Sequence, residues 1–150
     1  MSNDFWPEGK TAALSLTFDD ARLSQVDQGL PLLDAYGVKA TFYVSIQPMQ
    51  QRISKWKQAL ENGHEVGNHT FNHPCSGNFS FSRNSALEDY TLERMKNEII
   101  EANAAIEQAL GITPKTFAYP CGQKFVGRAQ GVKSVCSFGR PAFPGWSRCL

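Results

Sequence analysis

The chain has 150 residues, enough for one domain with its own core, and its 41% hydrophobic and 19% charged residues are typical of a globular protein. Its apolar runs are far shorter than the about 18 residues of a membrane-spanning helix, which excludes a membrane protein. Residues 108–150 hold six bases and no acid, but these bases are scattered without helical spacing, so we expect no nucleic-acid partner.

Strand patterns and helix patterns alternate along the first 119 residues. Strands are predicted at residues 12–18, 39–45, 65–67 and 115–119. Helices are predicted at residues 25–36, 53–63 and 85–110. Pro31 marks a start or kink in the first helix, and a capping box from Ser85 to Glu88 is predicted to open the last. This alternation predicts an α/β fold with a parallel sheet.

Three histidines lie within residues 64–73, and two of them are spaced so that they could bind the same metal ion. His69 and His73 stand four residues apart, so one helical turn would place both imidazoles on the same face. Two imidazoles make half of a divalent-metal site and leave a carboxylate to come from elsewhere. Asp19 and Asp20 end the first predicted strand, where adjacent carboxylates need a cation or a proton to compensate them. We therefore predict that Asp20, His69 and His73 bind a metal and that Asp19 is free as a base.

Two of these segments carry a family resemblance. Thr17-Phe18-Asp19-Asp20, followed by His69-Thr70-x-x-His73, resembles the first two motifs of the polysaccharide deacetylase family, also known as the NodB homology domain or carbohydrate esterase family four. Residues 117–122 resemble its third motif. The resemblance covers roughly residues 5–124 and implies an incomplete version of the family's distorted (β/α) barrel.

The resemblance also implies a role for each motif residue. Asp19 corresponds to the family's general base, while Asp20, His69 and His73 correspond to the ligands of a divalent cation. We expect zinc, because two imidazoles and a carboxylate suit a borderline-soft ion. The residues expected to form the oxyanion or substrate-binding site are Tyr119, Pro120, Cys121 and Gly122.

The implied reaction is a metal-dependent hydrolysis that removes N-acetyl groups, which are amide-linked, from a carbohydrate. Two alternatives stay open: a cytosolic amidase acting on a small non-sugar substrate, and a non-catalytic remnant that binds a metal or a glycan. Phe79 and Phe81 either line a sugar-binding groove or pack locally. His64 matches no motif position and is interpreted as structural.

Beyond residue 124 the alternation of strands and helices ends. We divide the chain into a partial deacetylase-like domain at residues 1–124 and an irregular basic tail at residues 125–150. We expect a truncated or frame-shifted product without the late histidine that acts as the family's general acid. Because an open sheet leaves backbone groups unpaired, we also expect self-association.

Two further expectations concern the cell compartment. The N-terminus has neither a basic start nor an apolar core, so we find no signal peptide and expect a cytoplasmic protein. The cysteines match no zinc-ribbon spacing and are expected to be reduced thiols: Cys75, Cys121, Cys136 and Cys149.

Overall fold

The computed structural model describes residues 9–128 and 131–135 of the chain. Its main sheet has three parallel strands in the order β1-β2-β3, at Thr17–Asp19, Thr41–Val44 and Glu65–Asn68. A fourth strand was predicted at residues 115–119, but this segment forms only an isolated parallel bridge, between Phe117 and Asn68. The predicted α/β fold with a parallel sheet is confirmed, and these strands close no barrel within the described residues, as expected for an incomplete one.

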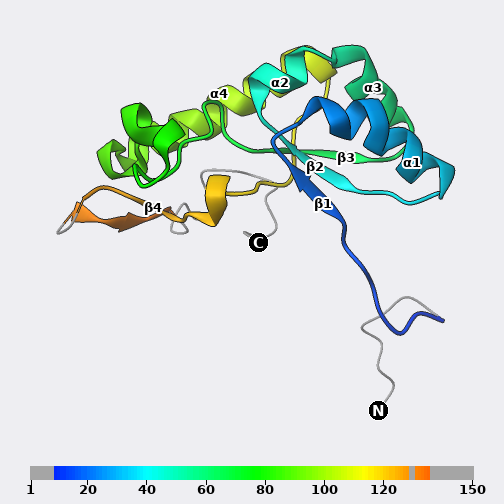
Figure 1. Cartoon of the computed structure of the whole chain (residues 1–150), viewed down its shortest axis with the longest axis horizontal. Coiled ribbons are helices and arrows are strands. Elements are labelled where there is room, and N and C mark those ends of the chain that lie inside the picture. Colours follow the sequence, from blue (N-terminus) through cyan, green and yellow to red (C-terminus); the bar gives the residue numbers. More distant parts are fainter. Residues whose placement is uncertain (1–8, 129–130, 136–150) are drawn as a thin grey trace.

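Helices cover one side of this sheet, and the longest of them, α4, crosses over it (Figure 1). The α-helices are α1 (Leu30–Ala35), α2 (Ile46–Gln50), α3 (Ile53–Glu61) and α4 (Leu92–Leu110). A π-helical turn at Gln25–Gly29 leads into α1, and shorter 3₁₀ turns lie at Ser80–Ser85, Leu87–Asp89 and Pro120–Gly122. No helix of the described residues is both long and apolar enough to cross a membrane.

The two ends of α4 are set by different signals. The Thr91 side chain caps the N-terminus and accepts a hydrogen bond of 3.1 Å from the Arg94 amide. The predicted start at Ser85 is therefore wrong, because Glu88 accepts hydrogen bonds from Ser76 and Gly77 and does not fold back on its own helix. Gly111, with φ +76°, ends the helix as predicted.

The hydrophobic core consists of two clusters. In the first, Phe42 of β2 packs edge-on against Trp56 of α3, with ring centroids 5.3 Å apart, and both side chains are almost fully buried. Each such burial contributes about 1.5–3 kcal/mol. The second cluster lies under the first half of α4 and includes Leu87, Met95, Ile99, Phe117, Tyr119, Val126 and Val135.

The first strand is shorter and more exposed than its apolar sequence predicts. Residues 12–18 were predicted as a buried strand, but β1 covers only Thr17–Asp19 and all three of its residues are exposed. Within the described residues β1 pairs with β2 alone and forms an edge of the sheet. An edge strand with one open face buries little of its apolar surface, which explains the difference.

Residues 125–135 form a short antiparallel pair in which β4 (Phe125–Val126) is bonded to β5 (Lys133–Ser134). Val126 and Val135 are buried in the second cluster, so this segment packs onto the preceding chain. Residues 136–150, including Cys136 and Cys149, lie outside the described residues. The proposed domain boundary at residue 124 stays a prediction.

Candidate active site

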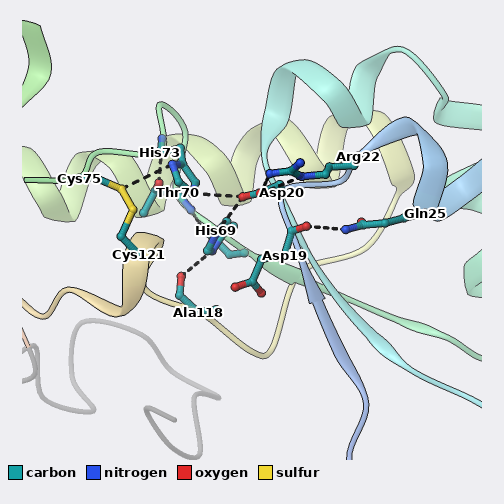
Figure 2. A network of polar contacts seen from close by, with 11 residues as sticks. Asp19, Asp20, Arg22, Gln25, His69, Thr70, His73, Cys75, Ala118 and Cys121 are labelled. Carbon is teal, nitrogen blue, oxygen red and sulfur yellow. Dashed lines mark hydrogen bonds and ion pairs between the residues drawn. A yellow bond between two sulfur atoms is a disulfide. The ribbon is translucent and has the colours of Figure 1, made fainter. Parts of the chain in front are cut away.

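The acidic pair lies at the carboxyl end of β1, where the chain turns sharply toward α1. Asp20 and Ala21 have φ values of +77° and +55°, and Ala21 is fully buried. The Gln25 side-chain amide donates a hydrogen bond of 2.6 Å to the Asp19 carbonyl. These contacts direct the two adjacent carboxylates to different places: Asp20 toward the histidines and Asp19 to the exposed side of β1 (Figure 2).

The two histidines come from a loop that follows β3, which we call the histidine loop (residues 69–74). This loop is not helical, so the predicted helical turn is wrong. Thr70 and His73 both have positive φ values, of +66° and +51°. The Thr70 amide donates to the Asn68 side chain at 2.7 Å, and the Thr70 hydroxyl accepts from the His73 amide at 3.1 Å. These bonds fold the loop back on itself, so that both imidazoles still converge.

Asp20, His69 and His73 meet as the sequence predicts. The Asp20 Oδ1 atom lies 3.2 Å from the Nε2 atom of His73 and 3.6 Å from the Nε2 atom of His69 (Figure 2). In a tetrahedral site with ligand distances of about 2.1 Å, neighbouring ligand atoms lie about 3.4 Å apart. The spacing of these three groups therefore fits one divalent cation.

The orientation of His69 is fixed by a main-chain acceptor that the sequence could not reveal. Its Nδ1 atom donates a hydrogen bond of 2.9 Å to the carbonyl oxygen of Ala118. The proton of the neutral ring is thus held on Nδ1, and the lone pair of Nε2 faces Asp20. Such an outer hydrogen bond is usual for metal-binding histidines, so the donor set fits in its chemistry as well as its spacing.

Burial keeps His69 in the form that can bind a metal. The side chain is 1% exposed, and this desolvation lowers its pKa, although the Ala118 hydrogen bond and the charges of Asp19 and Asp20 oppose the effect. The ring therefore stays neutral at lower pH than a free imidazole would.

Arg22 is hydrogen-bonded to the second carboxylate oxygen of Asp20. Its guanidinium donates hydrogen bonds of 3.2 and 3.3 Å to Oδ2, which leaves Oδ1 for the histidines. The Arg22 side chain is 73% exposed, so its own position is only weakly fixed. Sequence analysis did not single out Arg22, because an arginine two residues after an acid is an ordinary surface pattern.

The third-motif turn, residues 117–122, is linked by a covalent bond to Cys75, the residue just after the histidine loop. Cys75 and Cys121 form a disulfide, so the prediction of reduced thiols is wrong for these two residues.

The predicted oxyanion residues separate into two groups. Tyr119 and Pro120 are buried, and Tyr119 packs edge-on against Phe117, whereas Cys121 and Gly122 are exposed at the turn. The expected cytoplasmic location stays a prediction.

A cavity of about 410 Å³ opens beside Asp20 and His73. Phe71 and Phe81 form part of its wall, and Phe81 is 67% exposed. Phe79 stacks on Phe81 with ring centroids 5.4 Å apart. Phe81 thus lines the cavity next to the candidate metal ligands, and Phe79 stacks against Phe81.

His64, the remaining histidine, belongs to the scaffold. Its Nδ1 atom accepts a hydrogen bond of 3.2 Å from the Ala40 amide, and its Nε2 atom donates one of 3.1 Å to Asp34. The side chain is fully buried between β2 and α1 and joins the two elements. The interpretation of His64 as structural is confirmed.

This geometry places a candidate cation site at the edge of an open α/β sheet, and comparison with known proteins identifies the family of the chain. Residues 7–134 match the polysaccharide deacetylase family, and the chain belongs to that family. It is 35% identical over 118 residues to the peptidoglycan-N-acetylglucosamine deacetylase PgdA of Listeria monocytogenes. That alignment covers 77% of this chain and 23% of the relative.

Solved structures of the same kind superpose on the chain. The peptidoglycan deacetylase PdaC of Bacillus subtilis gives a TM-score of 0.60 at 28% identity, over 77% of this chain and 50% of that one. A structure described as T48 deacetylase with substrate gives a TM-score of 0.62 at 27% identity, over 79% of this chain and 52% of that one. The chain thus spans about half of these structures and about a quarter of the Listeria relative.

Proposed function

We propose that this protein is a metal-dependent hydrolase that removes N-acetyl groups from a carbohydrate. The observation that carries the proposal is the convergence of Asp20 Oδ1 with the Nε2 atoms of His69 and His73 at ligand spacing. Membership of the polysaccharide deacetylase family supports it, as do relatives named as deacetylases of peptidoglycan N-acetylglucosamine.

Each residue at the site has a distinct proposed task. A divalent cation, for which we propose zinc, would polarise the acetamide carbonyl and make a bound water more acidic. Asp19 would serve as the general base for the attacking water, because its carboxylate is exposed beside His69 and is separate from the three candidate ligands. Asp20, His69 and His73 would hold the cation. The turn at Cys121 and Gly122 supports the oxyanion from the side of the third motif.

The cavity beside His73 is the proposed place for the sugar. Its exposed Phe81 ring offers an apolar face to a pyranose, and Arg22 and Asn72 add polar groups to the lining. A pocket with an aromatic wall and a few polar groups suits a polyhydroxylated ring better than a small apolar amide.

The adjacent acids allow a matched test. Asp19→Asn is expected to retain the metal and to lose about 10²–10⁴-fold in deacetylation of a chito-oligosaccharide, since it removes the base alone. Asp20→Asn is expected to lose the metal itself. Metal content by elemental analysis and acetate release measure the two effects separately. Loss of metal from Asp19→Asn as complete as from Asp20→Asn would contradict the division of roles.

The same assay distinguishes the alternatives. Acetate release from small N-acetylated amides but not from the oligosaccharide would favour an amidase. Metal binding without turnover of either substrate would favour a non-catalytic role in metal or glycan binding.

For the metal, His69→Ala and His73→Ala are each expected to lower the zinc content of the purified protein, and unchanged zinc in both would contradict the ligand assignment.

A further inference from the structure

The Cys75–Cys121 disulfide lies next to the Nδ1 atom of His73. The proposed function assigns no role to this nitrogen. His73 directs Nε2 at Asp20, and its Nδ1 atom lies 3.8 Å from the Cys75 sulfur. Cys121 completes a group in which one nitrogen and two sulfur atoms all lie within 4.8 Å of one another. These three side chains come from the histidine loop, the residue just after it and the third-motif turn (Figure 2).

We propose that reduction of the Cys75–Cys121 disulfide creates a second metal site, formed by the two thiolates and His73 Nδ1, for a soft or borderline divalent cation such as zinc or cadmium. Two thiolates and an imidazole are ligands that such cations prefer. The fourth position is open to water, because Cys121 is exposed.

The distances require little rearrangement. With metal–sulfur and metal–nitrogen distances of about 2.3 and 2.05 Å, a tetrahedral site places sulfur and nitrogen about 3.6 Å apart. The observed 3.8 Å between Cys75 Sγ and His73 Nδ1 is close to this value. The two sulfur atoms would have to separate to about 3.8 Å. Rotation of the exposed Cys121 side chain can supply that movement, whereas Cys75 is buried and stays in place.

The reductant we name is a dithiol. One of its thiolates attacks the sulfur of Cys121, which is an exposed residue, and the Cys75 sulfur leaves and takes up a proton. The second thiol of the reductant then closes onto the first, and the Cys121 sulfur leaves in turn. The disulfide gains two electrons and two protons, and the dithiol becomes a cyclic disulfide. Binding of the cation then displaces both thiol protons.

The two metal sites would exclude each other, and this part of the inference rests on the proposed function. A cation on Nδ1 confines the proton of a neutral His73 ring to Nε2, the atom that faces Asp20. The hydrolytic site then keeps two of its three ligands. The disulfide thus protects the hydrolytic site, and a reducing compartment containing a soft cation would disable it.

Cobalt(II) is a suitable probe, because thiolate ligands give it intense charge-transfer absorption that carboxylates and imidazoles do not. The test uses the full chain with Cys136→Ser and Cys149→Ser, and a phosphine as a reductant without thiols. We expect no thiolate-to-cobalt band in the oxidised protein. After reduction we expect one equivalent of cobalt with that band, while far-UV circular dichroism shows that the fold persists.

Three variants assign the band. Cys121→Ser is expected to abolish it, and His73→Ala to weaken cobalt binding at the thiolate site by about tenfold or more, as expected when a metal site is damaged. Asp20→Asn is expected to leave the band unchanged although it impairs the hydrolytic site, which separates this inference from the proposed function. Absence of the band in the reduced protein, its survival in Cys121→Ser, or unfolding on reduction would each overturn the proposal.

Discussion

Asn72 of the histidine loop is bound to Glu98 of α4 by two hydrogen bonds. The Asn72 amide donates to Glu98 Oε2 at 2.8 Å, and its side chain donates to Oε1 at 2.9 Å. The hydroxyl of Tyr90 donates to the same Oε1 atom at 2.9 Å, and burial together with the Glu98 charge raises the pKa of Tyr90 to about 12. Glu98 is itself buried, at 4% exposure, so the loop that carries both histidines is fastened to the longest helix.

We predict that Glu98→Gln lowers both stability and metal affinity. The amide can accept at only one of its two ends, so at least one hydrogen bond to Asn72 or Tyr90 is lost, at a cost of about 1.5–3 kcal/mol. Urea unfolding and zinc titration measure the two effects. Glu101→Gln, at an exposed position of α4, is the matched control and should change neither. Equal metal affinity in the two variants would show that Glu98 does not position the loop.

We predict that Gly67→Ala destabilises the sheet at β3. A methyl group on Gly67 would lie 2.6 Å from a ring carbon of Tyr43 and 2.7 Å from the Thr116 hydroxyl. Such overpacking costs about 1–3 kcal/mol. In Gly29→Ala the new methyl group meets nothing closer than 3.7 Å, and we expect a small gain of about 0.5–1 kcal/mol because alanine favours a helix. Denaturant midpoints compare the two, and equal stability would contradict the prediction.

The stability of the metal-free protein should depend on pH through His69. Burial lowers its folded pKa below the reference value of 6.5. Below that pH the unfolded chain binds a proton at His69 that the folded chain does not, so the free energy of unfolding falls as the pH falls. The fall levels off once the folded imidazole is also protonated. Thermal unfolding of His69→Gln should show a shallower decline over the same range, and a parallel decline would contradict this cause.

We predict that the Cys75–Cys121 disulfide stabilises the folded chain by about 2–4 kcal/mol. It joins residues 46 positions apart and so closes a long loop in the unfolded state. A phosphine should lower the unfolding midpoint of the parent and leave that of Cys121→Ser unchanged. A parent whose midpoint does not respond to the phosphine would show that the bond contributes nothing.

We propose that the chain self-associates through the region of β1. Leu14, just before this strand, is 85% exposed, and Phe18 within it is 36% exposed. In the described residues β1 also has one unpaired edge. Leu14→Lys is expected to reduce association in sedimentation velocity, since edge lysines oppose strand pairing. Leu32→Lys on α1, where Leu32 is 60% exposed, is the control. A monomeric parent would contradict the proposal.

The convergence of the candidate ligands could be predicted from the sequence, because it depends on which side chains follow each strand. Asp19 and Asp20 at the end of β1 and two histidines just after β3 lie at the same edge of a parallel sheet. Parallel strands bring their carboxyl ends together whatever the loops do. The convergence of Asp20, His69 and His73 therefore followed from topology, although the helical turn assumed for the histidines was wrong.

What the sequence did not reveal depends on contacts between distant segments. The Ala118 carbonyl that orients His69 is a backbone group and leaves no trace in residue type. Glu88 matched a capping box, but its carboxylate accepts hydrogen bonds from Ser76 and Gly77 instead. The helix α4 therefore begins later, at Leu92. The pairing of Cys75 with Cys121 requires that the third-motif turn lie beside the histidine loop, which no spacing rule encodes.

Backbone strain is concentrated at the site. Among the described residues, the non-glycine residues with positive φ all lie in the three motif segments or directly after one of them: Asp20, Ala21, Thr70, His73 and Cys121. Each costs on the order of 1–3 kcal/mol, which the two core clusters must offset. The geometry of the candidate ligands is thus preorganised without a bound cation. Replacing Ala21 by glycine would relieve the strain at one of these positions but loosen the turn that holds Asp20, so stability and preorganisation oppose each other at that residue.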